Sequence, residues 1–185
     1  MTGLPTNTRP LLAVLAFAVV SLGAHGAADA ACGTVTAWGH NGTGQQAVPA
    51  DLTDVRAVSA GCCMGVALKN DGTLVGWGDE SWGWKSGLVG KKDIAAVSAG
   101  LASVVALTRS GTVLAWGYNN KGQTKVPAGL KSVVAIATGA YHAVALKADG
   151  TIVAWGGDSG GCVSQANGQK GFIKIAAYGE RTAGI

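Results

Sequence analysis

The hydrophobic positions predict three kinds of short strand in the chain after residue 33. One kind lies at residues 55–60 and recurs at 94–99, 133–138 and 172–177. A second lies at 65–68 and recurs at 104–107 and 143–146, and a third is a Gly-Thr-x-x-x-Trp-Gly run that begins at 33, 72, 111 and 150. The runs are nearly continuous in Ala, Val, Ile and Leu instead of alternating, which indicates strands buried on both faces. Small sheets stacked face to face bury their strands in this way.

Four tryptophans show that the pattern is a repeat. Trp38, Trp77, Trp116 and Trp155 follow one another at equal intervals without an insertion. A period of about 40 residues means a solenoid, a propeller or an array. We divide the chain into units 33–71, 72–110, 111–149 and 150–185, and expect the four tryptophans at equivalent sites in four successive antiparallel sheets. A turn such as Asn70-Asp71-Gly72 separates each of the first three units from the next, and Asp-Gly tips favour the primed turns of tight hairpins.

The composition agrees with an all-β protein and excludes several classes. Glycine supplies 30 of 185 residues, and charged residues make up 13% of the chain against 48% hydrophobic ones. Few charges with ordinary apolar content exclude an intrinsically disordered chain. The formal net charge of +4 is spread thinly, so nothing favours nucleic-acid binding. Four cysteines are too few for a disulfide scaffold.

The first 30 residues have the pattern of a secretory signal peptide. Residues 11–20 are wholly apolar, and Ala28-Asp29-Ala30 fits the cleavage rule for small residues. The apolar run is shorter than the ~20 residues of a membrane span, so we prefer a cleaved leader to a signal anchor. We therefore expect a repeat domain over 31–185, secreted to the periplasm or the extracellular space, with no membrane contact after the leader is removed.

Two longer phrases connect the repeat with a known family. Residues 111–130 read Gly-Thr-Val-Leu-Ala-Trp-Gly-Tyr-Asn-Asn-Lys-Gly-Gln-Thr-Lys-Val-Pro-Ala-Gly-Leu, and residues 139–150 read Gly-Ala-Tyr-His-Ala-Val-Ala-Leu-Lys-Ala-Asp-Gly. They resemble the regulator of chromosome condensation (RCC1) repeat, over essentially all of residues 33–185. The short unit with a Gln-x-x-Val-Pro connection is most similar to the secreted bacterial branch, which includes a propeller-type β-lactamase inhibitory protein.

The resemblance implies a β-propeller with seven blades, of which this chain supplies about four short ones. Seven units of this length would exceed the whole chain, and the part after the leader holds three full units and a shorter fourth. The alternatives are a truncated gene or fragment, closure by self-association, and a ring of four blades, and we favour the first. Open blade edges would attract partners, including further copies of the chain.

The candidate partner-binding residues are aromatic and lie in the predicted loops. Trp82 and Trp84 replace polar residues of the other units, and tryptophan is enriched at interface hot spots. The alternative is that both pack over a neighbouring blade. Tyr118 and Tyr141 occupy other loop positions, and the resemblance implies that the column of Tyr141 carries aromatic residues on the binding face. That column reads Cys63, Ala102, Tyr141 and, after a shift of one residue, Arg181, so only one member is aromatic.

Other residues with chemical potential have a structural interpretation. Ser159 lies in a Gly-Asp-Ser-Gly-Gly sequence typical of chymotrypsin-like proteases, but the repeat register makes this a polar loop after a strand. We expect His142 to hydrogen-bond a neighbouring blade. Cys62 and Cys63 are adjacent, so on a strand they would point to opposite faces. Either is free or paired with Cys32 or Cys162, and the connectivity stays open.

These observations predict a secreted, non-enzymatic RCC1-like propeller, or a fragment of one, that binds another protein through its loops. We expect no catalytic residues, no metal site and no cofactor. The alternative is a secreted inhibitor of a hydrolase such as a β-lactamase. Exchange of guanine nucleotides on a small GTPase and an enzymatic role rank lower.

Overall fold

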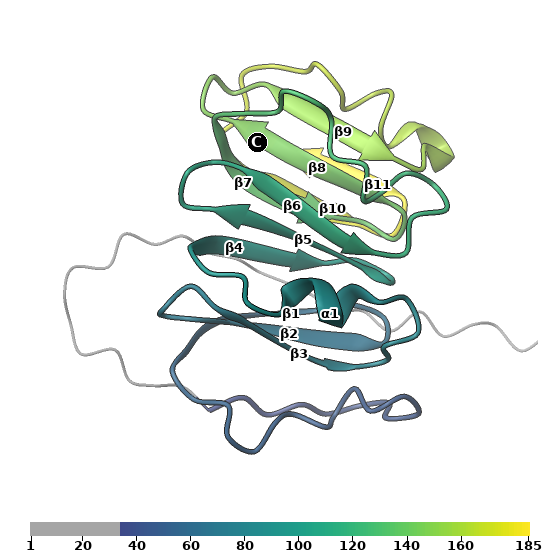
Figure 1. Cartoon of the computed structure of the whole chain (residues 1–185). Helices are drawn as coiled ribbons and strands as arrows, with labels where there is room; N and C mark the ends of the chain where they lie inside the picture. The colour runs from purple at the N-terminus through teal and green to yellow at the C-terminus, as the bar shows by residue number, and fades with distance from the viewer. Residues whose placement is uncertain (1–33) are drawn as a thin grey trace, which may run out of the picture.

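The apolar runs form β-strands in a computed structural model that describes residues 34–185 (Figure 1). The predicted leader over 1–30, with Cys32, lies outside the described residues. Three sheets have three antiparallel strands each: β1 (Val55–Ala60), β2 (Met64–Lys69) and β3 (Leu74–Gly78), then β4 (Ile94–Ala99), β5 (Ser103–Thr108) and β6 (Val113–Gly117), then β7 (Val133–Thr138), β8 (His142–Lys147) and β9 (Ile152–Gly156). A fourth sheet has two strands, β10 (Ile175–Tyr178) and β11 (Arg181–Gly184). Two short helices lie in loops, α1 (Trp84–Leu88) and the 3-10 helix η1 (Ser159–Gly161).

Each three-stranded sheet spans two sequence units, because its third strand is the Gly-Thr-x-x-x-Trp-Gly run of the next unit. Trp77, Trp116 and Trp155 pair with Gly65, Val104 and Ala143 at the same register of their sheets. The prediction of equivalent sites is therefore confirmed for these three tryptophans. It is wrong for Trp38, which joins no strand and is 86% exposed. The described residues hold no earlier strands against which the run around Trp38 could pair.

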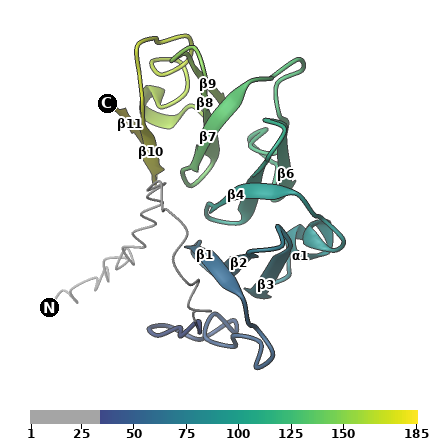
Figure 2. The ribbon, with the colours of Figure 1, turned by 90° about the vertical axis from the view of Figure 1, so that its left-hand side faces the viewer.

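The sheets fan out in an arc in which successive first strands contact one another: β1 with β4, β4 with β7 and β7 with β10 (Figure 2). The middle strands β2, β5 and β8 are buried at all residues but the last, as their unbroken apolar runs predict. Hydrophobic clusters fill the spaces between sheets, for example Val66 and Leu68 of the first sheet with Val104 of the second. Face-to-face stacking therefore supplies the core.

A column of glycines lets the sheets approach closely near the first strands. A Cβ atom on Gly61 would lie 2.1 Å from the carbonyl oxygen of Gly100, and one on Gly100 would lie 2.5 Å from that of Gly139. Side-chain hydrogen bonds cross the same boundary, since the hydroxyl of Ser59 accepts the N–H of Ala99 at 2.9 Å. The repeated glycine is thus required by sheet packing.

The fourth sheet keeps this packing although its sequence departs from the repeat. The carbonyl of Gly179 takes the place next to Gly139, where a Cβ atom would lie 2.7 Å away. The next strand, β11, begins at Arg181, exactly one repeat period after the start of β8 at His142. The loop before β11 is therefore shorter than its equivalents, and the register of the strand is kept. Glu180, not Arg181, is the fourth member of the column that contains Tyr141.

The hairpin tips differ from the predicted primed turns. The N–H of Gly72 donates to the carbonyl of Lys69 at 3.0 Å, and that of Lys69 donates to Thr73 at 2.9 Å. Gly72 has φ 82°, whereas Asn70 and Asp71 are not among the residues with positive φ. A primed turn of type I′ needs positive φ at both central residues, so the tip is an ordinary turn followed by a glycine bulge. Asp71 favours this form because its carboxylate accepts the N–H of Thr73 at 2.9 Å.

Candidate functional site

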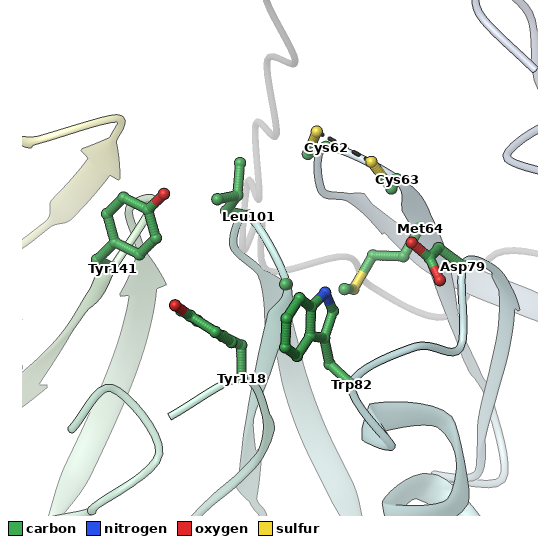
Figure 3. Close-up of a pocket in the computed structure, with 9 residues that line it drawn as sticks. Cys62, Cys63, Met64, Asp79, Trp82, Leu101, Tyr118 and Tyr141 are labelled. Atoms are coloured by element: carbon green, nitrogen blue, oxygen red, sulfur yellow. Dashed lines mark hydrogen bonds between the residues drawn. The ribbon is translucent and has the colours of Figure 1, made fainter. Parts of the chain in front are cut away.

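The candidate site lies on the face formed by one end of the sheets. In an antiparallel sheet the end of β1, the start of β2 and the end of β3 lie together, and the same holds for the next two sheets. Loops 61–63, 100–102 and 139–141 therefore lie on one face with the segments that follow β3 and β6. This arrangement brings Trp82, Tyr118 and Tyr141 together from three different loops (Figure 3).

Trp82, Tyr118 and Tyr141 form a continuous series, called the aromatic row below. The ring centroids of Trp82 and Tyr118 lie 4.6 Å apart with the planes at 71°, an edge-to-face contact. Tyr118 and Tyr141 follow with centroids 6.3 Å apart and planes at 55°. Such pairs favour fixed relative orientations of the rings. Trp82 is 50% exposed and both tyrosines are partly exposed, so the row presents an apolar, partly rigid surface with polar tips.

A pocket of about 260 Å³ lies beside the aromatic row. The row residues share its lining with Cys62, Cys63, Met64, Asp79, Leu101 and Ala102. Apart from Met64 in β2, the lining residues lie in loops of the first three sheets, so the pocket depends on how these sheets stack. Its volume lies below the ~300–1,000 Å³ typical of small-molecule sites, and it fits one or two side chains of a partner better than a cofactor.

Asp79 is the acidic group of the pocket. One of its carboxylate oxygens accepts hydrogen bonds from the hydroxyl and the N–H of Ser81, the latter at 2.8 Å. These bonds, that of the hydroxyl first, lower the pKa of Asp79, so it is ionised at neutral pH. The pocket therefore combines apolar rings with one negative charge at its rim.

The structure corrects the prediction for Trp84. Its side chain is fully buried, while Trp82 two residues earlier is half exposed. The ring packs in the cluster that fills the space between the first two sheets, and its indole N–H donates to the carbonyl of Asp79. Of the two interpretations open at the sequence level, packing is right for Trp84. It cannot contact a partner in this conformation.

The alignment of the repeat units could have predicted some of the other residues that line the pocket. Cys63, Ala102 and Tyr141 form the column that the family resemblance associates with a binding face, and all three line the pocket. Cys62 and Leu101 occupy the preceding column and also line the pocket, which the sequence pattern did not predict for that column. Asp79 and Met64 were also missed, because a single carboxylate and a strand methionine carry no distinctive pattern.

Ser159 and His142 do not form a catalytic pair. His142 is 2% exposed, and its Nε2 lies 2.9 Å from the hydroxyl oxygen of Thr182 on β11, which confirms the predicted hydrogen bond to a neighbouring blade. Burial lowers the pKa of His142, against smaller opposite effects of Asp158 and Glu180. Ser159 is exposed in η1, and its hydroxyl makes no hydrogen bond with another described residue.

The cysteine geometry differs from the expectation for a strand. Cys62 and Cys63 lie in the β1–β2 loop, and their sulfur atoms are 3.1 Å apart instead of on opposite faces. Both are free, and so is Cys162, which is buried with its thiol directed at the carbonyl of Gly157. Within residues 34–185 we find no group of three or more side chains able to hold a metal ion. The same part of the chain contains no helix long and apolar enough to span a bilayer.

Comparisons with known proteins agree with this architecture. The family model for the regulator of chromosome condensation (RCC1) repeat matches residues 94–123 and 133–162. The ectodomain of the receptor kinase CR4 from Physcomitrella patens is similar over 75% of this chain and 40% of its own, with 26% identity and a TM-score of 0.64. The ectodomain of the Arabidopsis thaliana receptor kinase ACR4 is similar over 71% and 45%, with 27% identity and a TM-score of 0.56.

A yeast structure shows the same fold at lower identity. Prp20p of Saccharomyces cerevisiae covers 80% of this chain with a TM-score of 0.64 and 17% identity, and the match takes 50% of its own chain. The chain thus spans half or less of the length of these three structures. No curated protein sequence matches it. The three-stranded sheets and these likenesses show consecutive blades of an RCC1-like propeller, and the RCC1 repeat itself is matched over residues 94–123 and 133–162.

Proposed function

We propose that this chain is a non-enzymatic, secreted protein that binds another protein through the aromatic row. The observation that carries the proposal is the convergence of Trp82, Tyr118 and Tyr141 from three loops onto one exposed face. Each side chain joins a large apolar area to a hydrogen-bonding tip, and such residues dominate the binding energy of protein interfaces. The fold itself does not need them, because the equivalent loop positions elsewhere hold other residue types.

Protein binding agrees with what the similar propellers are described as doing. The yeast Prp20p structure is reported with its binding to Gsp1p and histones, and yeast RCC1 (Prp20) is also known bound to Kap60. Those partners belong to those proteins. For this chain we place the partner on the face that carries the aromatic row, where the negative charge of Asp79 favours a basic group on the partner.

The binding test compares matched variants on the same fold. The parent and two variants, Trp82→Ala and Tyr141→Ala, are used to capture proteins from the medium of the source organism, and the dissociation constant of each captured protein is then measured. Loss of one anchor typically costs ~2 kcal/mol or more, which is about a 30-fold weaker affinity. Ser159→Ala is the control and should bind like the parent. Equal affinity of all four proteins would refute the proposed face, and hydrolysis abolished by Ser159→Ala would refute the non-enzymatic role.

The secreted location rests on the leader sequence alone. We expect a bacterial host that expresses the full chain to export it and remove residues 1–30, so that N-terminal sequencing begins at Ala31. Exported protein that begins at Met1 would contradict this part of the proposal. The loop-mediated binding would still stand.

The sheet edges support a second kind of contact, between copies of this chain. Within the described residues β11 pairs only with β10, and the strand-like run around Trp38 belongs to no sheet. Exposed strand edges recruit further strands. We expect concentration-dependent association in sedimentation experiments, weakened by Ala183→Lys on the exposed edge strand. A monomer at all concentrations would exclude it.

A further inference from the structure

Two adjacent thiols line the pocket. Cys62 is exposed and Cys63 is partly exposed, and the Cys63 thiol donates to the sulfur of Cys62 over 3.1 Å (Figure 3). Both thiols are free. Neighbouring residues on a strand would point apart, so this approach is a property of the loop between β1 and β2.

The cysteines are not needed to form this loop. The equivalent positions hold Leu101 and Ala102 in the second sheet, and Ala140 and Tyr141 in the third. Those loops make the same connection, since the N–H of Gly100 donates to Ser103 at 2.8 Å as the N–H of Gly61 donates to Met64 at 3.0 Å. A structural demand therefore does not explain two thiols here, and their chemistry is the remaining explanation.

We propose that Cys62 and Cys63 form a redox modification site that exchanges reversibly with low-molecular-weight disulfides such as glutathione disulfide. In the first step the Cys62 thiol loses its proton, and its thiolate attacks one sulfur of the small disulfide, releasing one small thiolate. In the second step the Cys63 thiolate attacks the Cys62 sulfur of this mixed disulfide and releases the second small thiolate. The two protein thiols are oxidised to one disulfide, the small disulfide is reduced to two thiols, and the two protons pass to these products.

The order of attack follows from the geometry of the pair. Cys62 is the more exposed thiol and accepts the hydrogen bond, whereas Cys63 holds its proton as the donor. That bond, with a smaller contribution from burial, raises the pKa of Cys63 to about 11. Since the thiolate is the nucleophile, Cys62 reacts first, and Cys63 is placed to resolve the mixed disulfide.

A bridge at this place would be a switch instead of a permanent crosslink. Neighbouring Cα atoms are about 3.8 Å apart, less than the usual ~4.4–6.8 Å of structural disulfides, so the small ring is strained and easily reduced. Strained or exposed disulfides are the labile and regulatory ones. Closing the bond moves the sulfur atoms to about 2.05 Å from each other at the rim of the pocket. The oxidised and reduced forms thus present different surfaces in the pocket that Trp82 also lines.

Peptide mapping of the purified full chain tests the site. Trypsin cleaves after Arg56 and Lys69, so one peptide holds both Cys62 and Cys63 and neither of the other cysteines. After incubation with glutathione disulfide and blocking of free thiols, this peptide should be two hydrogens lighter than the reduced form and carry no glutathione. Dithiothreitol should restore both thiols. A peptide that keeps two blockable thiols or two glutathione groups, or one joined to the Cys32 or Cys162 peptide, overturns the proposal.

Single substitutions test the separate roles of Cys62 and Cys63 in forming the disulfide. Cys63→Ser should stop at the mixed disulfide on Cys62, and Cys62→Ser should abolish closure. The matched control Cys162→Ser should close like the parent, because Cys162 is buried elsewhere. Phenylarsine oxide, which needs two nearby thiols, should bind the parent in a one-to-one complex and lose at least tenfold in affinity in either single variant. Unchanged affinity for phenylarsine oxide in both single variants would also overturn the proposal. These results do not depend on whether the aromatic row binds a protein.

Discussion

The loops that follow β3 and β6 start from equivalent strand ends but are anchored in opposite ways. In residues 118–132, called the glutamine loop here, the Gln123 side chain accepts the N–H of Lys121 at 3.0 Å, and its main-chain carbonyl accepts the Trp155 indole N–H at 3.0 Å. In residues 79–93, called the tryptophan loop, the position of Gln123 holds Trp84, whose ring is buried between sheets. The frame of the propeller thus accepts either a polar or an apolar anchor.

The apolar anchor requires a second change in the strand beneath it. A Cβ atom on Gly76 would lie 2.5 Å from the Trp84 ring. The equivalent positions in the other Gly-Thr-x-x-x-Trp-Gly runs hold alanine, at Ala37, Ala115 and Ala154. Gly76 and Trp84 therefore form one unit that replaces an alanine and a glutamine. With the anchor inside, α1 forms and Trp82 is left on the surface beside Tyr118.

The largest effect should come from removing the apolar anchor. Trp84→Ala leaves a large cavity between the first two sheets, and such truncations typically cost ~3–5 kcal/mol. Trp82→Ala is the matched control, since it removes the same side chain from the surface and loses at most its ring contact, about 0.5–1.5 kcal/mol. Urea unfolding measures both. Equal losses would mean that the two tryptophans do not differ as the structure shows.

Adding one methyl group under the anchor should give the next largest effect. Gly76→Ala places a Cβ atom against a buried ring, and overpacking of this kind costs ~1–3 kcal/mol, more than the ~0.5–1 kcal/mol that alanine gains over glycine in a strand. In the Trp84→Gln background the same substitution should cost less, because the ring is gone. A double-mutant cycle measures this coupling. Additive losses would show that Gly76 does not serve Trp84.

Much of this architecture could be predicted from the sequence, because the repeat forces equivalent residues into equivalent sites. The strand positions from β1 to β9 and the His142 hydrogen bond follow from register, and Tyr118 and Tyr141 do lie on one face with Trp82. The burial of Trp84 did not follow, since a tryptophan in a polar loop fits a surface or a core equally well. Gly76 is the sequence feature that indicates the burial of Trp84. A glycine in place of the alanine of the other units can be interpreted in this way only when its contact with the Trp84 ring is known.

The short distance between the sulfur atoms of Cys62 and Cys63 could not be predicted from the sequence pattern either. Alternation of side chains holds inside a strand, and these residues lie just after β1 ends. A boundary error of a few residues therefore reverses the conclusion about which sulfur atoms can meet. The exposure of Trp38 is a similar case, because its local sequence fits a blade strand and its pairing partners decide the structure.

Gln123, the polar anchor, should contribute less to the free energy of unfolding than Trp84, the apolar anchor. Gln123→Ala removes the acceptor of the Lys121 N–H, but it also removes a buried amide nitrogen that has no hydrogen-bond partner within the described residues. The two effects oppose each other, so we expect a loss of about 1 kcal/mol in urea unfolding. Gln45 is the equivalent residue of the first unit, and its side chain accepts the N–H of Thr43 at 2.9 Å in a solvent-exposed hydrogen bond. Gln45→Ala should therefore reduce the free energy of unfolding by less than Gln123→Ala. A loss as large as that of Trp84→Ala would remove the distinction between the anchors.

The smallest expected effect is that of acid, which should change the tryptophan loop and leave the glutamine loop unchanged. Hydrogen bonds from Ser81 lower the pKa of Asp79, whereas the glutamine loop uses the amide oxygen of Asn119, which accepts the Thr124 N–H at 3.0 Å and does not titrate. A lowered pKa means that the carboxylate stabilises the tryptophan loop above the ordinary value of ~3.9, and that this contribution is lost as the pH falls through the lower folded value. In NMR spectra the Ser81 amide should therefore shift with a midpoint below ~3.9, while the Thr124 amide stays unchanged. Asp79→Asn should abolish the Ser81 transition. A midpoint at or above the ordinary value would show that the carboxylate is not held by Ser81.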